Sequence, residues 1–371
     1  MASQVTNYKC PACTGPLHFV GTSGKLECDY CGAQYDVAQI EAMNADKEQQ
    51  ASAAFQAAEG AAPQQETPWD TSGMTTDWGT EGSGMKAYSC PSCGAELMCD
   101  ASTAATSCPY CGNPTVMPGQ FSGTLKPDFV IPFKLSREDA EKALKRHYQG
   151  KPLLPKAFTS ENHIKEMQGV YVPFWMFDGT AFGSVDYEGL ISHTHREGDF
   201  EVTLTEHYQV RRGGSLSFQR VPVDASTKMP DDHMDSIEPY DYNELKPFST
   251  AYLPGFLADR YDVSVDESRS RADTRCSSTL EAALQSTTEG YTGCIPLNKN
   301  IFLQRGRVSY ALMPVWMLHT KWNGKDFLFA MNGQTGKLVG DLPTDMKRFW
   351  TIFAAIAAPV SAIAAAVMML L

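Results

Sequence analysis

Cys90-Pro-Ser-Cys93 and Cys108-Pro-Tyr-Cys111 are two short CxxC segments separated by fourteen residues. Each CxxC segment forms a tight knuckle that directs two thiolates at one ion, and two knuckles complete a tetrahedral shell of four sulfur ligands. Gly94 and Gly112, which follow the knuckles, suit the turn that aims backbone amides at sulfur. The spacing is just under the usual zinc-ribbon range of about 15–20 residues. It predicts a four-cysteine zinc ribbon over residues 87–118.

The same pattern occurs once more, nearer the N-terminus. Cys10-Pro-Ala-Cys13 and Cys28-Asp-Tyr-Cys31 are also fourteen residues apart, which predicts a second zinc ribbon over residues 8–36. The predicted metal ligands are Cys10, Cys13, Cys28, Cys31, Cys90, Cys93, Cys108 and Cys111. Four thiolates leave no open coordination position, so we expect two structural Zn²⁺ ions, with a rubredoxin-like iron site as the alternative. Cys99 aligns with Phe19 of the other ribbon, which favours a core position over a ligand.

The charge and the cysteines of the chain limit the cellular compartment and the classes of binding partner that we expect. No secretory signal precedes the CxxC pairs, so we expect reduced thiols and a cytosolic compartment. The net charge is −12, and the sequence contains no run of basic residues that would favour binding to a polyanion. Between Asp224 and Glu244, seven acidic residues are accompanied by Lys228 alone. This stretch is either a solvated loop or a docking surface for a basic partner.

The last 23 residues, Phe349 to Leu371, carry no charge. As a helix they would extend about 34 Å, enough to cross a hydrocarbon core of about 30 Å. Lys347 and Arg348 precede this segment, which places the remainder of the chain on the cytoplasmic side of a cell membrane. We therefore expect a single-pass tail anchor over residues 349–371. A stripe of alanines at four-residue spacing would permit self-association: Ala354, Ala358, Ala362 and Ala366.

The remaining chain divides into a linker and a body. Residues 37–86 are rich in Ala, Gln, Gly, Ser and Thr, which predicts a flexible linker with Trp69 and Trp78 as isolated aromatic residues. We therefore expect the two ribbons to move independently. Residues 127–345 predict an α+β body with helices at about 136–148 and 262–285. Its separate strands include those expected at 171–177, 181–191, 301–308 and 312–319. Ser136-Arg-Glu-Asp139 indicates a capping box, and Asn332-Gly333 indicates a hairpin loop.

The body also contains a faint internal repeat. Val172-Pro-Phe-Trp-Met-Phe177 resembles Met313-Pro-Val-Trp-Met-Leu318. Internal duplication with both segments in a shared core is one interpretation, and two independent apolar strands are the other. The expected fold class is thus multidomain: two small four-cysteine zinc ribbons, an α+β body and a C-terminal transmembrane helix.

The sequence offers few candidates for a catalytic site. His193, His195 and His207 lie among carboxylates, but their spacing matches no metal-binding motif, so we expect solvated strand ends. Phosphate-loop, HExxH and GxSxG motifs are absent from the sequence. We therefore expect a protein that is not an enzyme.

The motifs together resemble a bacterial family of membrane-anchored double zinc-ribbon proteins, often described as TFIIB-type zinc-ribbon or helicase PriA-like. The likeness includes the Cys-Pro-x-Cys knuckles, Gly169–Trp175, Met313–Trp316, Met331–Gly336, Leu342-Pro343 and the final helix. In some bacteria such a protein is encoded beside an SPFH-domain protein and works with PspA-like membrane-stress proteins. The resemblance implies an adaptor or scaffold in envelope stress, with SPFH-domain or PspA-like partners. It does not imply helicase activity, because the ATP-binding motifs are absent from the sequence.

We therefore expect a membrane-tethered adaptor whose ribbons bind protein partners at the cytoplasmic face of the membrane. The alternative is a membrane-associated nucleic-acid-binding protein. Both ribbons are slightly acidic and neither contains arginine, which argues against that alternative. Tyr30 and Tyr110, each inside a knuckle, are candidates for stacking on a base or on a partner protein.

Overall fold

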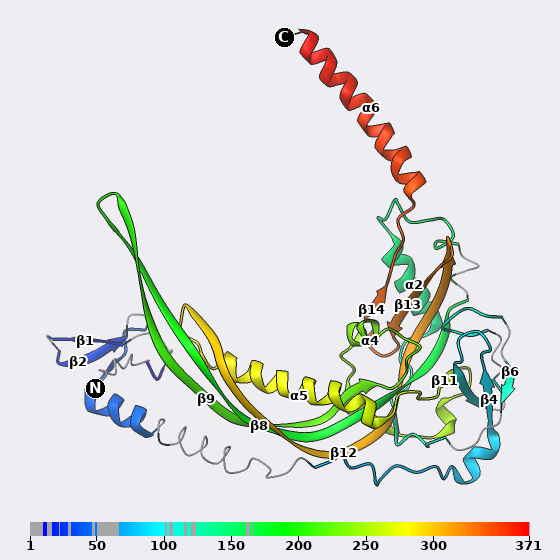
Figure 1. Ribbon diagram of the computed structural model, residues 1–371, viewed down its shortest axis with the longest axis horizontal. Coiled ribbons are helices and arrows are strands. Elements are labelled where there is room, and N and C mark those ends of the chain that lie inside the picture. The colour runs from blue at the N-terminus through cyan, green and yellow to red at the C-terminus, as the bar shows by residue number, and fades with distance from the viewer. Residues whose placement is uncertain are drawn as a thin grey trace. The chain divides into compact units, whose positions relative to one another are not determined.

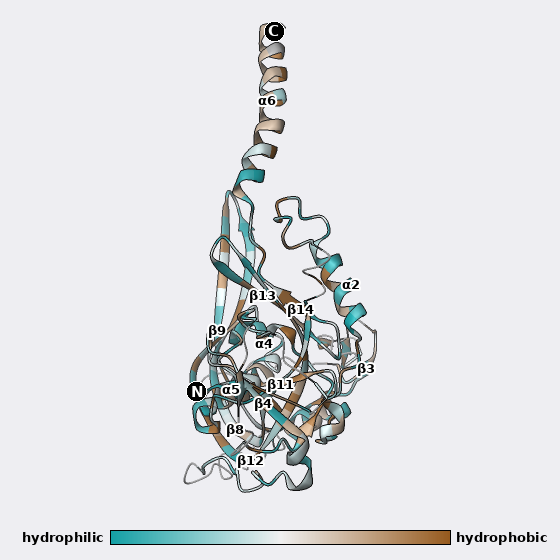
Figure 2. Ribbon diagram, turned by 90° about the vertical axis from the view of Figure 1, so that its right-hand side faces the viewer, coloured by the Kyte–Doolittle hydropathy of each residue, from teal (hydrophilic) through white to brown (hydrophobic). Residues whose placement is uncertain are grey.

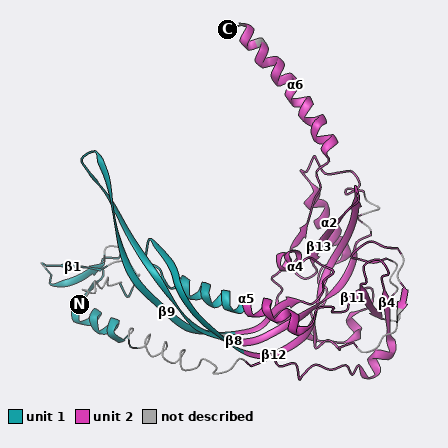
Figure 3. Ribbon diagram, viewed as in Figure 1, with its two compact units in different colours: residues 1–66, 180–217, 276–304 teal, residues 67–179, 218–275, 305–371 magenta. Residues whose placement is uncertain are grey.

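The computed structural model describes residues 10–12, 17–21, 23–28, 31–46, 49, 67–100, 102–103, 107–114, 117–119, 124–160, 164 and 166–370. The chain divides into two compact units, distinguished by colour in Figure 3. Unit 1 comprises residues 1–66, 180–217 and 276–304, and unit 2 comprises residues 67–179, 218–275 and 305–371. Several long elements continue from one unit into the other, so neither unit is a single stretch of sequence.

A small sheet lies around the first pair of knuckles in unit 1. It contains β1 (Leu17–Val20), β2 (Lys25–Cys28) and β3 (Gln34–Tyr35) in that order, with antiparallel pairing throughout. Residues 37–46 form a helix after it. These short strands have little apolar surface to bury, so a metal ion bound to the cysteines would contribute to the stability of this module.

An eleven-stranded mixed sheet forms the rest of the β structure (Figure 1). Its strand order is β10-β7-β12-β8-β11-β5-β4-β6, with β9 beside β8, β13 beside β12 and β14 beside β13. The strands are β4 (Met85–Ser89), β5 (Glu96–Asp100), β6 (Met117–Gly119), β7 (Phe129–Val130), β8 (Gln168–Glu197), β9 (Phe200–Asp224), β10 (Lys246–Pro247), β11 (Leu257–Asp259), β12 (Gly293–Trp322), β13 (Lys325–Asn332) and β14 (Leu338–Gly340).

The helices differ greatly in length. Besides the helix at residues 37–46, the described α-helices include α2 (Arg137–Tyr148), α4 (Asp231–Ile237), α5 (Val265–Ser286) and α6 (Met346–Leu370), and the described 3-10 helices are η1 (Gly79–Gly84), η2 (Tyr242–Glu244) and η3 (Thr250–Tyr252). The predicted capping box is confirmed: the Ser136 side chain accepts from the Asp139 amide, and the Asp139 carboxylate accepts from the Ser136 amide. The predicted helix at 262–285 and the hairpin at Asn332-Gly333 are also observed, as α5 and as the β13–β14 connection.

Strands predicted as separate segments join into longer ones. The expected strands within residues 171–191 form the single strand β8, and those within 301–319 form part of β12. Gly306 makes the close packing possible, because a Cβ there would lie 2.5 Å from the carbonyl oxygen of Asp178. Isolated glycines within these runs therefore mark close backbone approach and do not end the strands.

The core of unit 2 lies where β8 and β12 are neighbours. The two similar segments, Val172–Phe177 and Met313–Leu318, lie in these strands and are almost wholly buried. Their indole groups are both satisfied: Trp175 Nε1 donates to the carbonyl of Val263 at 2.9 Å, and Trp316 Nε1 donates to that of Leu135 at 3.1 Å. Burial on both faces explains why these runs are continuously apolar, with or without an internal duplication.

Part of the expected flexible linker is ordered. Trp69 and Trp78 are both 8% exposed. Trp69 packs edge-on against Phe177 with ring centroids 4.8 Å apart, and Trp78 packs in the same way against Phe248 at 5.7 Å. Trp78 Nε1 also donates to the carbonyl oxygen of Thr124 at 2.8 Å. The flexible-linker prediction is therefore wrong for residues 67–86. The composition of this segment is polar, but its two tryptophans pack against residues of the core that are far away in the sequence.

The acidic stretch between Asp224 and Glu244 has basic partners that its local sequence does not contain. Two arginines on α5 face it: Arg271 lies 2.7 Å from Asp224 and 3.0 Å from Asp235, and Arg275 lies 3.0 Å from Glu238. Burial raises the pKa of Asp224, and the adjacent Arg271 partly offsets this rise. Asp224 and Glu238 are thus held by arginines of α5, whereas Asp232 and Asp241 are exposed, so the interpretation as a solvated loop is wrong for the paired residues only.

The C-terminal helix α6 is long and apolar enough to cross a membrane. Figure 2 shows its hydrophilic first turn and the more apolar remainder. Its 25 residues correspond to about 37 Å, and large side chains along it, such as Trp350 and Ile363, are exposed. Ala366 lies in α6, but its side chain is outside the described part. Length and exposure together support the predicted anchor, which requires a lipid environment to cover these side chains.

Replacing Trp78 with alanine tests the ordering of residues 67–86. We expect Trp78→Ala to lower the free energy of unfolding by about 3 kcal/mol, because it removes a buried indole and leaves a cavity. Urea denaturation of the detergent-solubilised full-length protein measures this change. A change of less than about 0.5 kcal/mol, the size expected at an unpacked surface position, would contradict the ordered packing.

Candidate metal centre

Three knuckles share one backbone geometry in the described part of the chain. In each, the glycine after the second cysteine donates its amide to the carbonyl of the first cysteine, at 2.9, 2.9 and 3.0 Å for Gly32, Gly94 and Gly112. These glycines have φ values of 68°, 71° and 68°. Because φ near +70° is unfavourable for residues with a Cβ, glycine is required there. The glycine that follows each of these knuckles is thus a backbone requirement of the ligand motif.

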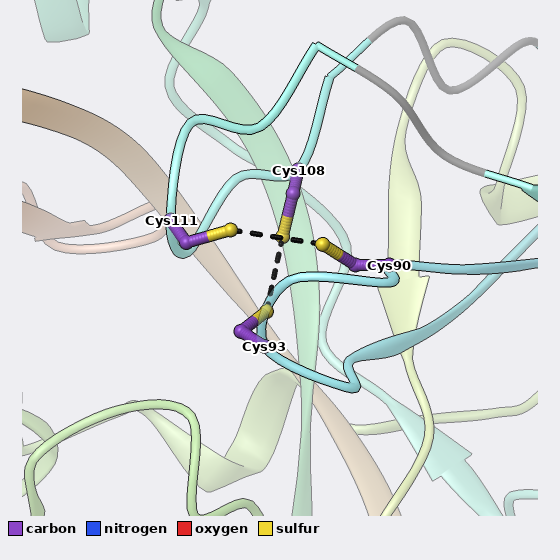
Figure 4. A group of neighbouring side chains, drawn as sticks. All are labelled: Cys90, Cys93, Cys108 and Cys111. Carbon is purple, nitrogen blue, oxygen red and sulfur yellow. Dashed lines mark hydrogen bonds between the residues drawn. The ribbon is translucent and has the colours of Figure 1, made fainter.

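The second pair of knuckles brings its four predicted ligands together. The sulfur atoms of Cys90, Cys93, Cys108 and Cys111 all lie within 4.8 Å of one another, and Figure 4 shows them converging on one point. Two of the separations, Cys90–Cys111 and Cys93–Cys108, are 3.6 Å. A tetrahedron with metal–sulfur bonds of about 2.3 Å has sulfur atoms about 3.8 Å apart. The residues present therefore fit a tetrahedral thiolate-bound ion, and the donor set alone accepts zinc or iron.

The first pair of knuckles is described in part. Cys10, Cys28 and Cys31 offer ligand atoms within 4.8 Å of one another, and the Cys10 and Cys31 sulfur atoms are 3.6 Å apart. The predicted fourth ligand, Cys13, lies outside the described residues, as does Tyr30. Three of the four predicted ligands are consequently brought together, in a geometry that resembles the second site.

The cysteines of the second site differ in how readily their thiols lose a proton. Burial opposes ionisation of Cys90, but hydrogen bonds with the backbone amides of Cys93 and Ser92 and with the thiols of Cys111 and Cys93 together lower the pKa of the Cys90 thiol to about 7. Burial raises the pKa values of Cys93 and Cys108. Burial therefore opposes the thiolate forms of Cys93 and Cys108, and a bound cation would supply charge that stabilises them.

Tyr110, between the second pair of ligands, faces inward. It is 7% exposed, and its hydroxyl donates to Asp259 Oδ2 on β11 at 2.7 Å. Ser226 donates to the same oxygen at 2.6 Å. Burial raises the pKa of Asp259 to about 7, and these two hydrogen bonds limit the rise. The prediction that Tyr110 stacks on a base or partner is wrong, because its ring is part of the core that joins the knuckle to the body.

The second knuckle pair is also joined to the body through the sheet. β5 pairs with β11 in antiparallel register, Met98 opposite Ala258, and β11 pairs in parallel with β8. Side chains add to this connection: Gln168 donates to Ser107 at 2.7 Å, and Arg260 donates to Glu96 at 2.6 Å. The second cysteine site is therefore built into the α+β body, and the expectation of an independently moving ribbon is wrong for it.

Other candidate residues lie apart from the cysteine sites. Cys99 is fully buried, and its thiol donates to the carbonyl oxygen of Thr103 at 3.3 Å, in agreement with the core position expected from the sequence. His193 and His195 lie in the exposed end of β8, and His207 bonds to Glu188 at 2.8 Å on the surface. Within the described ranges, the groups suited to hold a metal consist of cysteines alone.

The residues that join the site to the body could not be predicted from the sequence. Tyr110 is expected there in a different role, and Asp259, Ser226 and Gln168 belong to no recognisable motif. Their partners are 33 to 149 residues away. The available signal was the composition of the Cys-Pro-Tyr-Cys knuckle, where a tyrosine needs a partner for its hydroxyl if it is buried.

Removing one ligand of the second site tests the metal assignment. We expect Cys90→Ser to lose about one ion per chain, because a hydroxyl does not replace a thiolate in a closed shell. Inductively coupled plasma mass spectrometry of purified protein measures the stoichiometry and identifies the metal. Cys276→Ser, at a buried cysteine outside both groups, is the matched control and should keep its full metal content. Equal metal content in the two variants would contradict the assignment.

Comparison with known proteins gives one informative relationship. No family model matches the chain, so the resemblance to double zinc-ribbon proteins stays a prediction, and no solved structure matches it either. The chain is 35% identical over 320 residues to the uncharacterized protein YdjG of Bacillus subtilis (strain 168). The match covers 73% of this chain and 94% of YdjG, so it includes most of both proteins. The chain therefore belongs to the same family as YdjG.

Proposed function

We propose that this protein is a membrane-anchored scaffold that binds other proteins at the cytoplasmic face of the membrane, with two structural zinc sites in its fold. Envelope stress is the proposed setting, and SPFH-domain or PspA-like proteins are the proposed partners, on the resemblance described above. The proposal requires a surface for partners, an anchor in the membrane, and metal sites that support the fold without taking part in a reaction.

The observation that carries the proposal is a pair of exposed apolar rows on the strands of unit 1. On β9, the alternate residues Phe200, Val202 and Leu204 are 77%, 37% and 57% exposed. On β12, Ile295 and Leu297 are 49% and 59% exposed. Because alternate residues of a strand project from one face, each row is a continuous apolar strip. Exposed apolar strips of this kind favour contact with another protein.

The cysteine sites favour a structural role within this proposal. Four thiolates close the coordination shell of the second site, so no position remains for water or a substrate. Its ligands are also tied to β11 and β8 through Tyr110 and β5, which makes the metal a support for the body. These features support a scaffold in which the ions maintain the partner-binding fold.

The anchor supports the proposed location. Helix α6 has the length and composition of a membrane span, and Lys347 and Arg348 lie in its first turn. Positive residues beside a span remain on the cytoplasmic side, so the two units would be cytoplasmic. The nucleic-acid-binding alternative lacks comparable support, because the described part of the second knuckle pair carries Lys86 against Glu96 and Asp100.

Photo-crosslinking tests the proposal in the native membrane. We place a photoreactive amino acid at Leu204 or Leu297 of the full-length chain, irradiate membranes and identify the products by mass spectrometry. We expect crosslinks to a defined set of proteins from both positions. Thr203, which bonds to Thr194 and alternates with the apolar row along β9, is the control position.

Substitutions quantify the same contact. We expect Leu204→Asp with Leu297→Asp to reduce the recovery of the crosslinked proteins at least about tenfold, because a carboxylate would be buried against an apolar partner. Thr203→Asp adds a charge to the other face and should leave recovery unchanged. Recovery that is equal in the wild-type protein and both variants would contradict the proposal, and recovery of DNA in place of proteins would favour the alternative.

A further inference from the structure

The first turn of α6 is fixed to the turn that follows α2. The amide of Asp345 donates to the carbonyl of Leu153 at 2.9 Å, and the Arg348 guanidinium donates to that of Leu154 at 3.1 Å. The Asp345 carboxylate in turn accepts from the amides of Lys347 and Arg348. These contacts define the start of α6 relative to residues 149–160, so the surface around that turn lies where α6 would enter the membrane.

The tip of the β12–β13 hairpin lies beside the same turn. Phe158 packs edge-on against Phe327 with ring centroids 5.5 Å apart, and Trp322 packs on the buried cluster that contains Leu154 and Phe158. Figure 1 shows this hairpin tip and the turn after α2 at the end of unit 2 from which α6 leaves. Three segments that are far apart in the sequence consequently form one surface at the base of α6.

This surface is strongly basic. Its exposed cationic residues, which we call the basal basic surface, are Lys151, Lys156, Lys321, Lys325, Lys347 and Arg348. The acidic residues in the same segments are Asp326, which bonds to His319, Asp341, which lies 3.5 Å from His233, and Asp345, which caps α6. The six cations thus outnumber the acids two to one, in a chain of net charge −12.

The end of α2 extends the positive charge. Lys145 and Arg146 in its last turn are cationic, and the neighbouring His147 lies with its Nε2 3.2 Å from Lys151 Nζ. Burial lowers the pKa of His147, and the neighbouring Lys151 lowers it further. Favourable interaction with the helix dipole accounts for cations in a last turn. It does not account for the lysines of the hairpin tip and of the turn at residues 151–156, which are outside any helix.

We propose that the basal basic surface binds the headgroups of anionic phospholipids in the membrane that α6 crosses. The inference rests on the proposed membrane insertion of α6 and adds a lipid preference to it. Attraction between a lysine and an anionic leaflet is effective only within about one Debye length, roughly 8 Å at physiological salt. The contacts of Asp345 and Arg348 hold the turn at the start of α6, and therefore close to the headgroups.

Amide hydrogen exchange in lipid nanodiscs tests the inference on the full-length chain. One set of nanodiscs contains phosphatidylcholine alone, and the other contains phosphatidylcholine with phosphatidylglycerol. We expect peptides covering residues 149–160 to exchange at least about fivefold more slowly in the anionic nanodiscs, the factor that one cation contributes at such a surface. High salt should remove the difference.

Charge reversal provides the matched comparison. Lys151→Glu with Lys156→Glu should abolish the difference between the two lipid compositions. Arg196→Glu with Lys246→Glu changes the net charge by the same amount at exposed positions outside the basal basic surface and should retain it. Unchanged circular dichroism and metal content exclude misfolding of either variant.

The outcomes separate this inference from the function proposed above. Equal exchange of the wild-type protein in both lipids would overturn the lipid inference, as would full protection of the Lys151→Glu, Lys156→Glu variant. Neither result would affect partner binding through β9 and β12. Failure of the chain to elute with nanodiscs of either composition would overturn the membrane anchor itself, and the lipid inference with it.

Discussion

Four thiolates drawn to within 4.8 Å of one another repel strongly unless a cation lies among them. In the second site this constraint extends beyond the knuckles. Tyr110, which lies between two of the ligands, donates a hydrogen bond to Asp259. The strand β5, which follows the first knuckle, pairs with β11, and β11 pairs with β8. The ion would therefore hold together one edge of the main sheet as well as its own loop. A metal ion bound there would thus be part of the folding core of unit 2.

Features coded by adjacent residues could be predicted from the sequence. The CxxC knuckles with their glycines, the capping box at Ser136 and the hairpin at Asn332-Gly333 each depend on a few consecutive residues whose backbone preferences are strong. The apolar length of α6 is likewise a local property. For such features the residues that specify the structure also form it, and no distant partner is needed.

Features formed by residues that are far apart in the sequence could not be predicted from it. Trp78 looked like an incidental aromatic residue because its contact, Phe248, is 170 residues away in a different element. The acidic stretch looked unpaired because its arginines are on α5. The basal basic surface is not evident in the sequence for the same reason, since its cations stand on three segments that meet only when the chain folds. Composition and spacing report charge along the chain, whereas partner recognition depends on charge in space.

Hydrogen exchange of the full-length protein before and after chelation of its metal tests the central claim most directly. If the ion supports the body, its removal will accelerate exchange in β11 and in the adjacent residues 168–172 of β8, because β5 can no longer hold that edge of the sheet. Restoring the metal should restore protection. Acceleration confined to residues 85–119, with β11 and β8 unchanged, would show that the second cysteine site is a separate module and would contradict the account.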